Sequence, residues 1–107
     1  GGVGPAAFTV KLAIEAHQIM DRNGFLEQLK SDLANAAGVD PQRFTVESCG
    51  EIGFLSVNLS LASAPGSNAA EVVENLRRQH FDPNSPLNLK RGEFTSNILA
   101  ITVPQKY

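Results

Sequence analysis

The sequence predicts a single α+β domain built around a small antiparallel sheet. Runs of alternating apolar and polar residues, typical of strands, are separated by two segments that carry apolar residues at helical spacing. A chain of 107 residues has room for one domain. An apolar fraction of 42% is enough for a core without disulfides or metal. We expect the domain to cover residues 8–103, with a linker or cloning remnant at residues 1–7 and a tail at residues 104–107.

The N-terminal part predicts a strand followed by a helix. The apolar residues of the strand alternate with polar or small ones: Phe8, Val10, Leu12 and Ile14. A turn signal at residues 21–24 precedes apolar residues at helical spacing, and Gly38 provides a left-handed C-cap. We therefore expect a helix over residues 24–37.

The middle of the chain predicts a β-hairpin. Phe44 and Val46 share one face of its first strand, and the second strand has the most regular alternation in the chain: Leu55, Val57, Leu59 and Leu61. A two-residue turn at residues 50–51 and a four-residue loop over residues 50–53 both keep these apolar residues on one face. The sequence leaves the choice between the two registers open.

A second helix follows, and Asn68 and Glu71 have the spacing of a capping box at its start. Its apolar stripe consists of Ala69, Val72, Val73 and Leu76. Prolines in residues 82–86 interrupt the chain, and residues 87–91 are expected to be irregular or a short edge piece. Residues 94–103 are expected to form the last strand, with Leu99, Ile101 and Val103 on one face.

The resulting order, β-α-β-β-α-β, predicts a ferredoxin-like plait: a four-stranded antiparallel sheet with two helices on one face. In such a plait the second and fourth strands form the edges, and edge strands are natural templates for pairing with another chain. The fourth strand is the more hydrophobic edge. We expect Ile98 to project from the face opposite Leu99 and to be open to solvent. Ile98, Ala100 and Thr102 are therefore the predicted partner-binding residues.

The segment between the first helix and the hairpin carries a recognisable pattern. Residues 38–43 read Gly-Val-Asp-Pro-Gln-Arg, and residues 53–59 read Gly-Phe-Leu-Ser-Val-Asn-Leu. The pattern resembles SEA and SEA-like ferredoxin-fold modules, in which a helix ends in Gly-Val-x-Pro-x-Arg and a strand then leads into a Gly-Ser-Val hairpin. Over residues 8–103 the chain resembles in particular the conserved globular domain of trypanosomatid flagellum attachment zone proteins.

This resemblance implies a structural role, as a folded unit of a cytoskeletal filament protein of the flagellum. One position departs from the self-cleaving members of the SEA family. Phe54 stands where those members carry the hairpin Ser that attacks the preceding peptide bond. We therefore do not expect the domain to cleave itself.

The titratable residues predict no catalytic, cofactor or metal site. His17 and His80 have no ligand at metal-binding spacing. Cys49 would need a nearby base to act as a nucleophile, and the third strand of the plait would separate it from His17. The carboxylate pairs close in sequence, Glu47 with Glu51 and Glu15 with Asp21, are expected to be solvated surface charges.

Charge and composition argue against several partners. A formal net charge of -2 lacks the basic excess of a nucleic-acid binder, although residues 90–94 faintly resemble an RNA-recognition strand. No apolar run is long enough for a membrane span, and one cysteine excludes an intrachain disulfide. Asn58 heads a formal glycosylation triplet but is expected to lie in a central strand. We expect a cytoplasmic location, and the resemblance implies the cytoskeleton or flagellum.

The predicted function is a non-catalytic protein-interaction or scaffolding domain of a larger structural protein. The sequence leaves open which protein it binds and whether it forms a homodimer. The alternative is a regulatory, small-ligand-binding domain of the ACT kind. Residues 21–26, Asp-Arg-Asn-Gly-Phe-Leu, are similar to the turn at which ACT domains bind amino acids between paired subunits. The same turn also fits ordinary helix capping.

Overall fold

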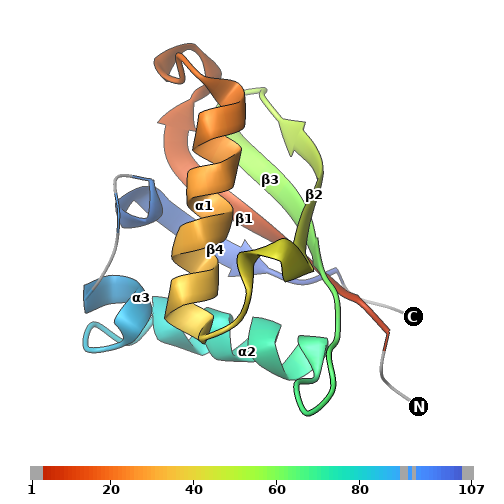
Figure 1. Cartoon of the computed structure of the whole chain (residues 1–107). Coiled ribbons are helices and arrows are strands. Elements are labelled where there is room, and N and C mark those ends of the chain that lie inside the picture. Colours follow the sequence, from red (N-terminus) through yellow and green to blue (C-terminus); the bar gives the residue numbers. More distant parts are fainter. Residues whose placement is uncertain (1–3, 90–91, 93, 105–107) are drawn as a thin grey trace.

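A computed structural model describes residues 4–89, 92 and 94–104 (Figure 1). Its strands are β1 (Ala6–Glu15), β2 (Phe44–Gly50), β3 (Phe54–Leu61) and β4 (Ile98–Thr102). Its α-helices are α1 (Arg22–Ala37), α2 (Ala69–His80) and α3 (Pro86–Leu89), and its 3₁₀ turns are η1 (Ala16–Gln18), η2 (Pro41–Arg43) and η3 (Thr95–Asn97). The outer ends of the predicted linker and tail, residues 1–3 and 105–107, lie outside the described residues.

The strands form one antiparallel sheet in the order β2-β3-β1-β4. This α+β architecture, with two main helices, confirms the predicted fold class, and the strand order fits a plait. β2 and β4 are the edges, and β3 lies between β1 and β2, as expected. Both long helices pack on one face of the sheet, and Figure 1 shows α1 crossing in front of the strands.

One hydrophobic core lies between the sheet and the helices. It is built from the residues predicted by alternation in β1 and β3 and from the apolar stripes of α1 and α2: Phe8, Val10, Leu12, Ile14, Leu55, Val57, Leu59, Leu61, Phe25, Leu29, Leu33, Val73 and Leu76. The opposite face of the sheet carries mainly polar and small side chains, with Phe54 as an exposed apolar residue at one end. Period two therefore assigns the two faces of the sheet correctly.

α1 begins two residues earlier than predicted, at Arg22 rather than Gly24. Asp21 is the N-cap, and its carboxylate accepts a hydrogen bond from the Gly24 N–H at 3.0 Å. The helix ends where expected, because Gly38 adopts a left-handed conformation with φ of 72°.

The hairpin register is neither of the two that the sequence allowed. Gly50 lies opposite Ser56, and residues 51–53 form the loop with Gly53 at a φ of 74°. The register shifts between Val46 and Ser48, so Glu47 is an additional residue in β2. This irregularity brings Cys49 opposite Val57, where its side chain packs against the core.

The C-terminal segment differs most from the prediction. The fourth strand begins at Ile98 rather than at residue 94, because Thr95–Asn97 form a 3₁₀ turn. Pro86–Leu89 form a single helical turn instead of an irregular or edge segment, and residues 90–91 lie outside the described residues. Helix α3 is held by Gln79 of α2, which is 9% exposed. The Gln79 Oε1 atom accepts from the Leu87 N–H at 2.9 Å, while its Nε2 atom donates to the Ala36 carbonyl at 3.0 Å.

The expectation that Ile98 faces solvent is wrong. The pairing of β4 with β1 is irregular, since Ala100 lies opposite Lys11 while Ile98 lies opposite Leu12. The extra residue, Leu99, allows Ile98 to pack against the core while Leu99 itself is 47% exposed. Of the three apolar residues expected to share a buried face, only Ile101 is buried.

Candidate functional site

The open face of the sheet is the candidate interaction surface, because neither long helix covers it. A row of hydrogen-bonded side chains crosses three strands on this face. The Thr9 hydroxyl donates to Asn58 Oδ1 at 2.6 Å, and Asn58 Nδ2 donates to Ser48 Oγ at 2.8 Å. These contacts hold short side chains in fixed positions, so that the surface loses little conformational entropy when another molecule covers it. They also occupy the amide of the Asn58 glycosylation triplet.

The predicted partner-binding residues are divided between two faces. Ala100 lies opposite Lys11 and Thr102 opposite Thr9, so both belong to the open face. Ala100 is half-buried and Thr102 is exposed. Ile98 belongs to the core face, and its substitution would test packing rather than partner contact.

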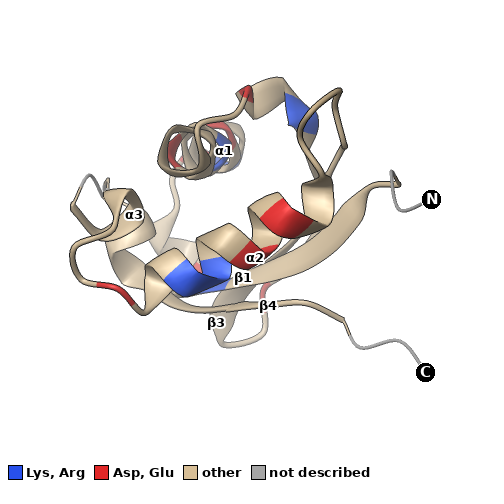
Figure 2. Cartoon of the chain, turned by 90° about the horizontal axis from the view of Figure 1, so that it is seen from below, with Lys and Arg blue, Asp and Glu red and all other residues tan. Residues whose placement is uncertain are grey.

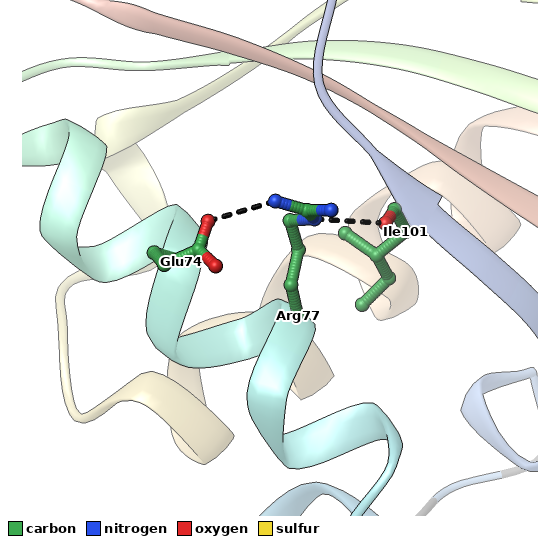
Figure 3. A network of polar contacts seen from close by, with 3 residues as sticks. All are labelled: Glu74, Arg77 and Ile101. Carbon is green, nitrogen blue, oxygen red and sulfur yellow. Dashed lines mark hydrogen bonds and ion pairs between the residues drawn. The ribbon is translucent and has the colours of Figure 1, made fainter.

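The outer edge of β4 is partly occupied by side chains from α2. Arg77 Nε donates to the Ile101 carbonyl at 3.4 Å, while Arg77 Nη1 contacts Glu74 Oε2 at 2.8 Å (Figure 3). A ring nitrogen of His80, Nε2, lies 3.2 Å from the Leu99 carbonyl oxygen. An incoming strand would have to displace both side chains, which is one way in which proteins protect sheet edges. The open face beside β4 is therefore a better candidate surface than the edge itself.

Cys49 lies partly buried at the end of β2. Burial raises the pKa of its thiol, an effect opposed by Arg22 and reinforced by Glu51. A raised pKa reduces the thiolate fraction at neutral pH. His17 lies in η1, just after β1, and β3 separates β1 from the strand that carries Cys49; the His17 ring lies 3.3 Å from Glu15.

The carboxylates close in sequence do not form acid-base pairs. Glu51 pairs with Arg22, Glu15 with His17, and Asp21 caps α1. Within residues 4–89, 92 and 94–104, no three His, Cys, Asp or Glu side chains are grouped closely enough to hold a metal ion. In the same residues, none of the helices combines the length and apolar character needed to cross a membrane.

The turn that resembles ACT domains lies beside a small surface cavity. This cavity has a volume of about 270 Å³ and is lined by residues that include Asp21, Gly24 and Phe94. The Asp21 carboxylate is engaged in capping, and a Cβ at residue 24 would lie 2.5 Å from one of its oxygens. Helix capping therefore accounts for both the Asp and the Gly of this turn.

Comparison with known proteins provides no relative. No family model, curated protein or solved structure matches the chain. The SEA-like pattern is therefore supported only by the residues of this chain. Within it, the Arg of Gly-Val-x-Pro-x-Arg has a clear structural role. Arg43 donates to the Ala62 carbonyl at 2.8 Å and to the Ser67 hydroxyl at 2.9 Å, so it joins the end of the hairpin to the loop before α2.

Two residues with important contacts were not predicted from the sequence. They are Gln79, which links α2 to α1 and α3, and Arg77, which links α2 to β4. The spacing of Gln79 from Leu76, three residues along the helix, was the available signal that it faces the core. Nothing local in the sequence indicates that Arg77 reaches β4.

Proposed function

We propose that this chain is a non-catalytic protein-interaction domain, of ferredoxin-like topology, within a larger structural protein. It works as a scaffold in the cytoplasm, as part of the cytoskeleton or flagellum, in keeping with the SEA-like pattern. Its contact surface is the open face of the sheet next to β4, which includes Ala100 and Thr102.

The observation that carries this proposal is the ordered polar row on a helix-free sheet face. Asn58 bonds to both Thr9 and Ser48. Most residues beside this row are short, whereas Lys11 and Phe54 on the same face are longer and exposed. A helix-free sheet face with a fixed polar row and exposed longer side chains suits contact with a folded protein better than with a small molecule, which requires a concave site. The raised pKa of the Cys49 thiol and the charge partners of the carboxylates favour a non-catalytic role.

The test compares the full-length parent protein with a variant of its open face. The parent is tagged and expressed in cells of its source organism, and its location and co-purifying proteins are recorded. Ala100→Lys combined with Thr102→Lys adds two charged side chains to the contact surface, so we expect proteins captured by the wild type to be lost. A matched control, Gln42→Lys, changes an exposed residue away from the sheet face and should leave the captured proteins unchanged.

Two outcomes would contradict the proposal. One is that the double variant, shown to be folded by circular dichroism, captures the same proteins as the wild type. The other is that the parent is a soluble metabolic enzyme, which would favour a regulatory role.

The cavity beside the Asp21 turn supports a second candidate, an ACT-like domain that binds an amino acid. Calorimetric titration with the twenty common amino acids tests it. Binding that Gly24→Val abolishes would support this candidate, whereas no heat with any amino acid would exclude it. A Cβ at residue 24 would also meet the capping carboxylate, so the folded state of the variant is checked by circular dichroism.

A further inference from the structure

The exposed flank of α2 that faces the edge of β4 carries four residues in an unusual order. Ala70, Glu74, Arg77 and Phe81 are separated by four, three and four residues. At 3.6 residues per turn this spacing places all four along one stripe of the helix. Phe81 belongs to the stripe because it keeps a helical conformation, with φ of -92° and ψ of -4°. We call these four residues the α2 stripe.

The chemistry of the α2 stripe is complementary to itself when read in the opposite direction. From one end it reads small, acidic, basic and aromatic; from the other it reads aromatic, basic, acidic and small. The spacing of four, three and four is the same in both directions. Two copies of α2 placed antiparallel would therefore align Phe81 with the second copy's Ala70, and Arg77 with the second copy's Glu74. Figure 2 shows the underlying separation of charge, with acidic residues in the first half of α2 and basic residues toward its end.

A cavity adjoins the small end of the stripe. It has a volume of about 360 Å³ and is lined by Ala70, Val73, Ala7, Val103 and other mainly apolar residues. A cavity of roughly 150 Å³ is already large enough for benzene, so this one has room for a phenyl ring. Ala70 is exposed at its mouth and presents no side chain beyond Cβ to block entry.

Phe81 has the properties of the group that would fill such a cavity. Phe81 is 80% exposed, so its ring is free to enter a partner's cavity. The ring of His80 contacts it edge to face with centroids 5.0 Å apart, and His80 in turn reaches the Leu99 carbonyl. Phe81 thus lies next to a side chain that reaches β4, at the end of the stripe opposite the cavity, and it borders the surface near Pro83 and α3.

The charged centre of the stripe can also serve two copies at once. Glu74 Oε2 contacts Arg77 Nη1 within the helix, and the Arg77 side chain also reaches Ile101 through Nε. Both side chains are partly exposed, Glu74 by 52% and Arg77 by 36%. Each guanidinium has further N–H donors and each carboxylate a second oxygen, so that two such pairs placed antiparallel form a four-membered charge cluster without like charges in direct contact.

We propose that the chain forms a two-fold symmetric homodimer through the α2 stripe, in which Phe81 of each copy enters the other copy's apolar cavity beside Ala70. Such an interface is isologous, because the same patch serves both copies. It is separate from the open face of the sheet and would bring two open faces into one particle.

The test measures the association of the 107-residue chain by sedimentation equilibrium from about 1 µM to 1 mM, a range suited to a small interface. We expect a concentration-dependent dimer. Phe81→Ala should weaken it by about tenfold or more. Met20→Ala removes a side chain that is 97% exposed and lies outside the stripe, so it should leave the dimer constant unchanged.

Charge reversal provides a test of the antiparallel arrangement. Arg77→Glu should weaken the dimer because the carboxylate introduced at position 77 of each copy would face the other copy's Glu74. Adding Glu74→Arg to that variant should restore association, since opposite charges again face each other. Both proteins lack the Arg77 contact to Ile101, so the loss of that contact does not explain a difference between them. The two also differ in the charge pair between residues 74 and 77 within α2, and urea unfolding at a concentration where both are monomers measures that contribution separately.

The proposal is overturned if the wild type is a monomer throughout the concentration range, if Phe81→Ala dimerises as well as the wild type, or if the double charge reversal associates no better than Arg77→Glu. Circular dichroism shows that each variant is folded. None of these results bears on the open-face proposal, which is tested through Ala100 and Thr102.

Discussion

Replacing Gln79 with Met tests whether one buried amide holds the helical layer together. The Gln79 side chain accepts from the Leu87 N–H at 2.9 Å and donates to the Ala36 carbonyl at 3.0 Å. Met has nearly the same length but no donor and only a weak acceptor, so it leaves both backbone groups unpaired in a site where the side chain is 9% exposed. Each buried unpaired group costs about 1–3 kcal/mol. We therefore expect the free energy of unfolding to fall by about 2–6 kcal/mol.

Urea unfolding followed by circular dichroism measures this change at equilibrium. In a thermal scan the same loss lowers Tm by at least about 8 °C, given a shift of about 4–8 °C per kcal/mol for a domain of this size. Gln42→Met is the matched control, because Gln42 is exposed and only its backbone N–H takes part in a described hydrogen bond. We expect the control to change stability by less than about 0.5 kcal/mol. If Gln79→Met is as stable as the control, the amide is not the link between α1, α2 and α3.

Leu59→Ala should lower the free energy of unfolding by about 2–5 kcal/mol because Leu59 is 1% exposed. Ser60→Ala, on the opposite face, should have little effect. Equal urea midpoints for the two variants would contradict the assigned faces of β3. Burial raises the pKa of the Cys49 thiol above its ordinary 9.0. Iodoacetamide should therefore alkylate the folded protein more slowly than the urea-unfolded chain at neutral pH, and the difference should shrink as the pH rises above 9. Faster alkylation of the folded state would refute this. The chain should stay intact during long incubation at neutral pH because Phe54 provides no nucleophile, and mass spectrometry that finds fragments ending at Gly53 would return the domain to the self-cleaving class.

The alternation of apolar residues predicted the two central strands correctly because both are long and have one fully buried face. In β3 every second residue from Leu55 onward is buried, and such a pattern allows only one assignment of faces. Helix ends were also predictable where a single residue decides them. Asp21 and Gly38 mark α1 through a cap and a left-handed backbone.

The edge strands were harder to predict because each contains one additional residue. Glu47 in β2 and Leu99 in β4 interrupt the pairing. After each of these residues, the positions that face the core and those that face the open side of the sheet are interchanged. The sequence around them still alternates, so that local periodicity places Ile98 on the wrong face. The contacts of Arg77 and Gln79 depend on segments far away in the chain, and the candidate site was therefore only partly predictable.

Photo-cross-linking from the open face tests the interaction proposal most directly. A photoreactive phenylalanine analogue is introduced at Thr102 in the full-length parent and irradiated in living cells, with the same analogue at Gln42 as the control. The open-face proposal predicts a covalent adduct to a different protein from position 102 and none from position 42. Absence of any adduct at position 102 under conditions in which the parent is folded and correctly located would contradict it.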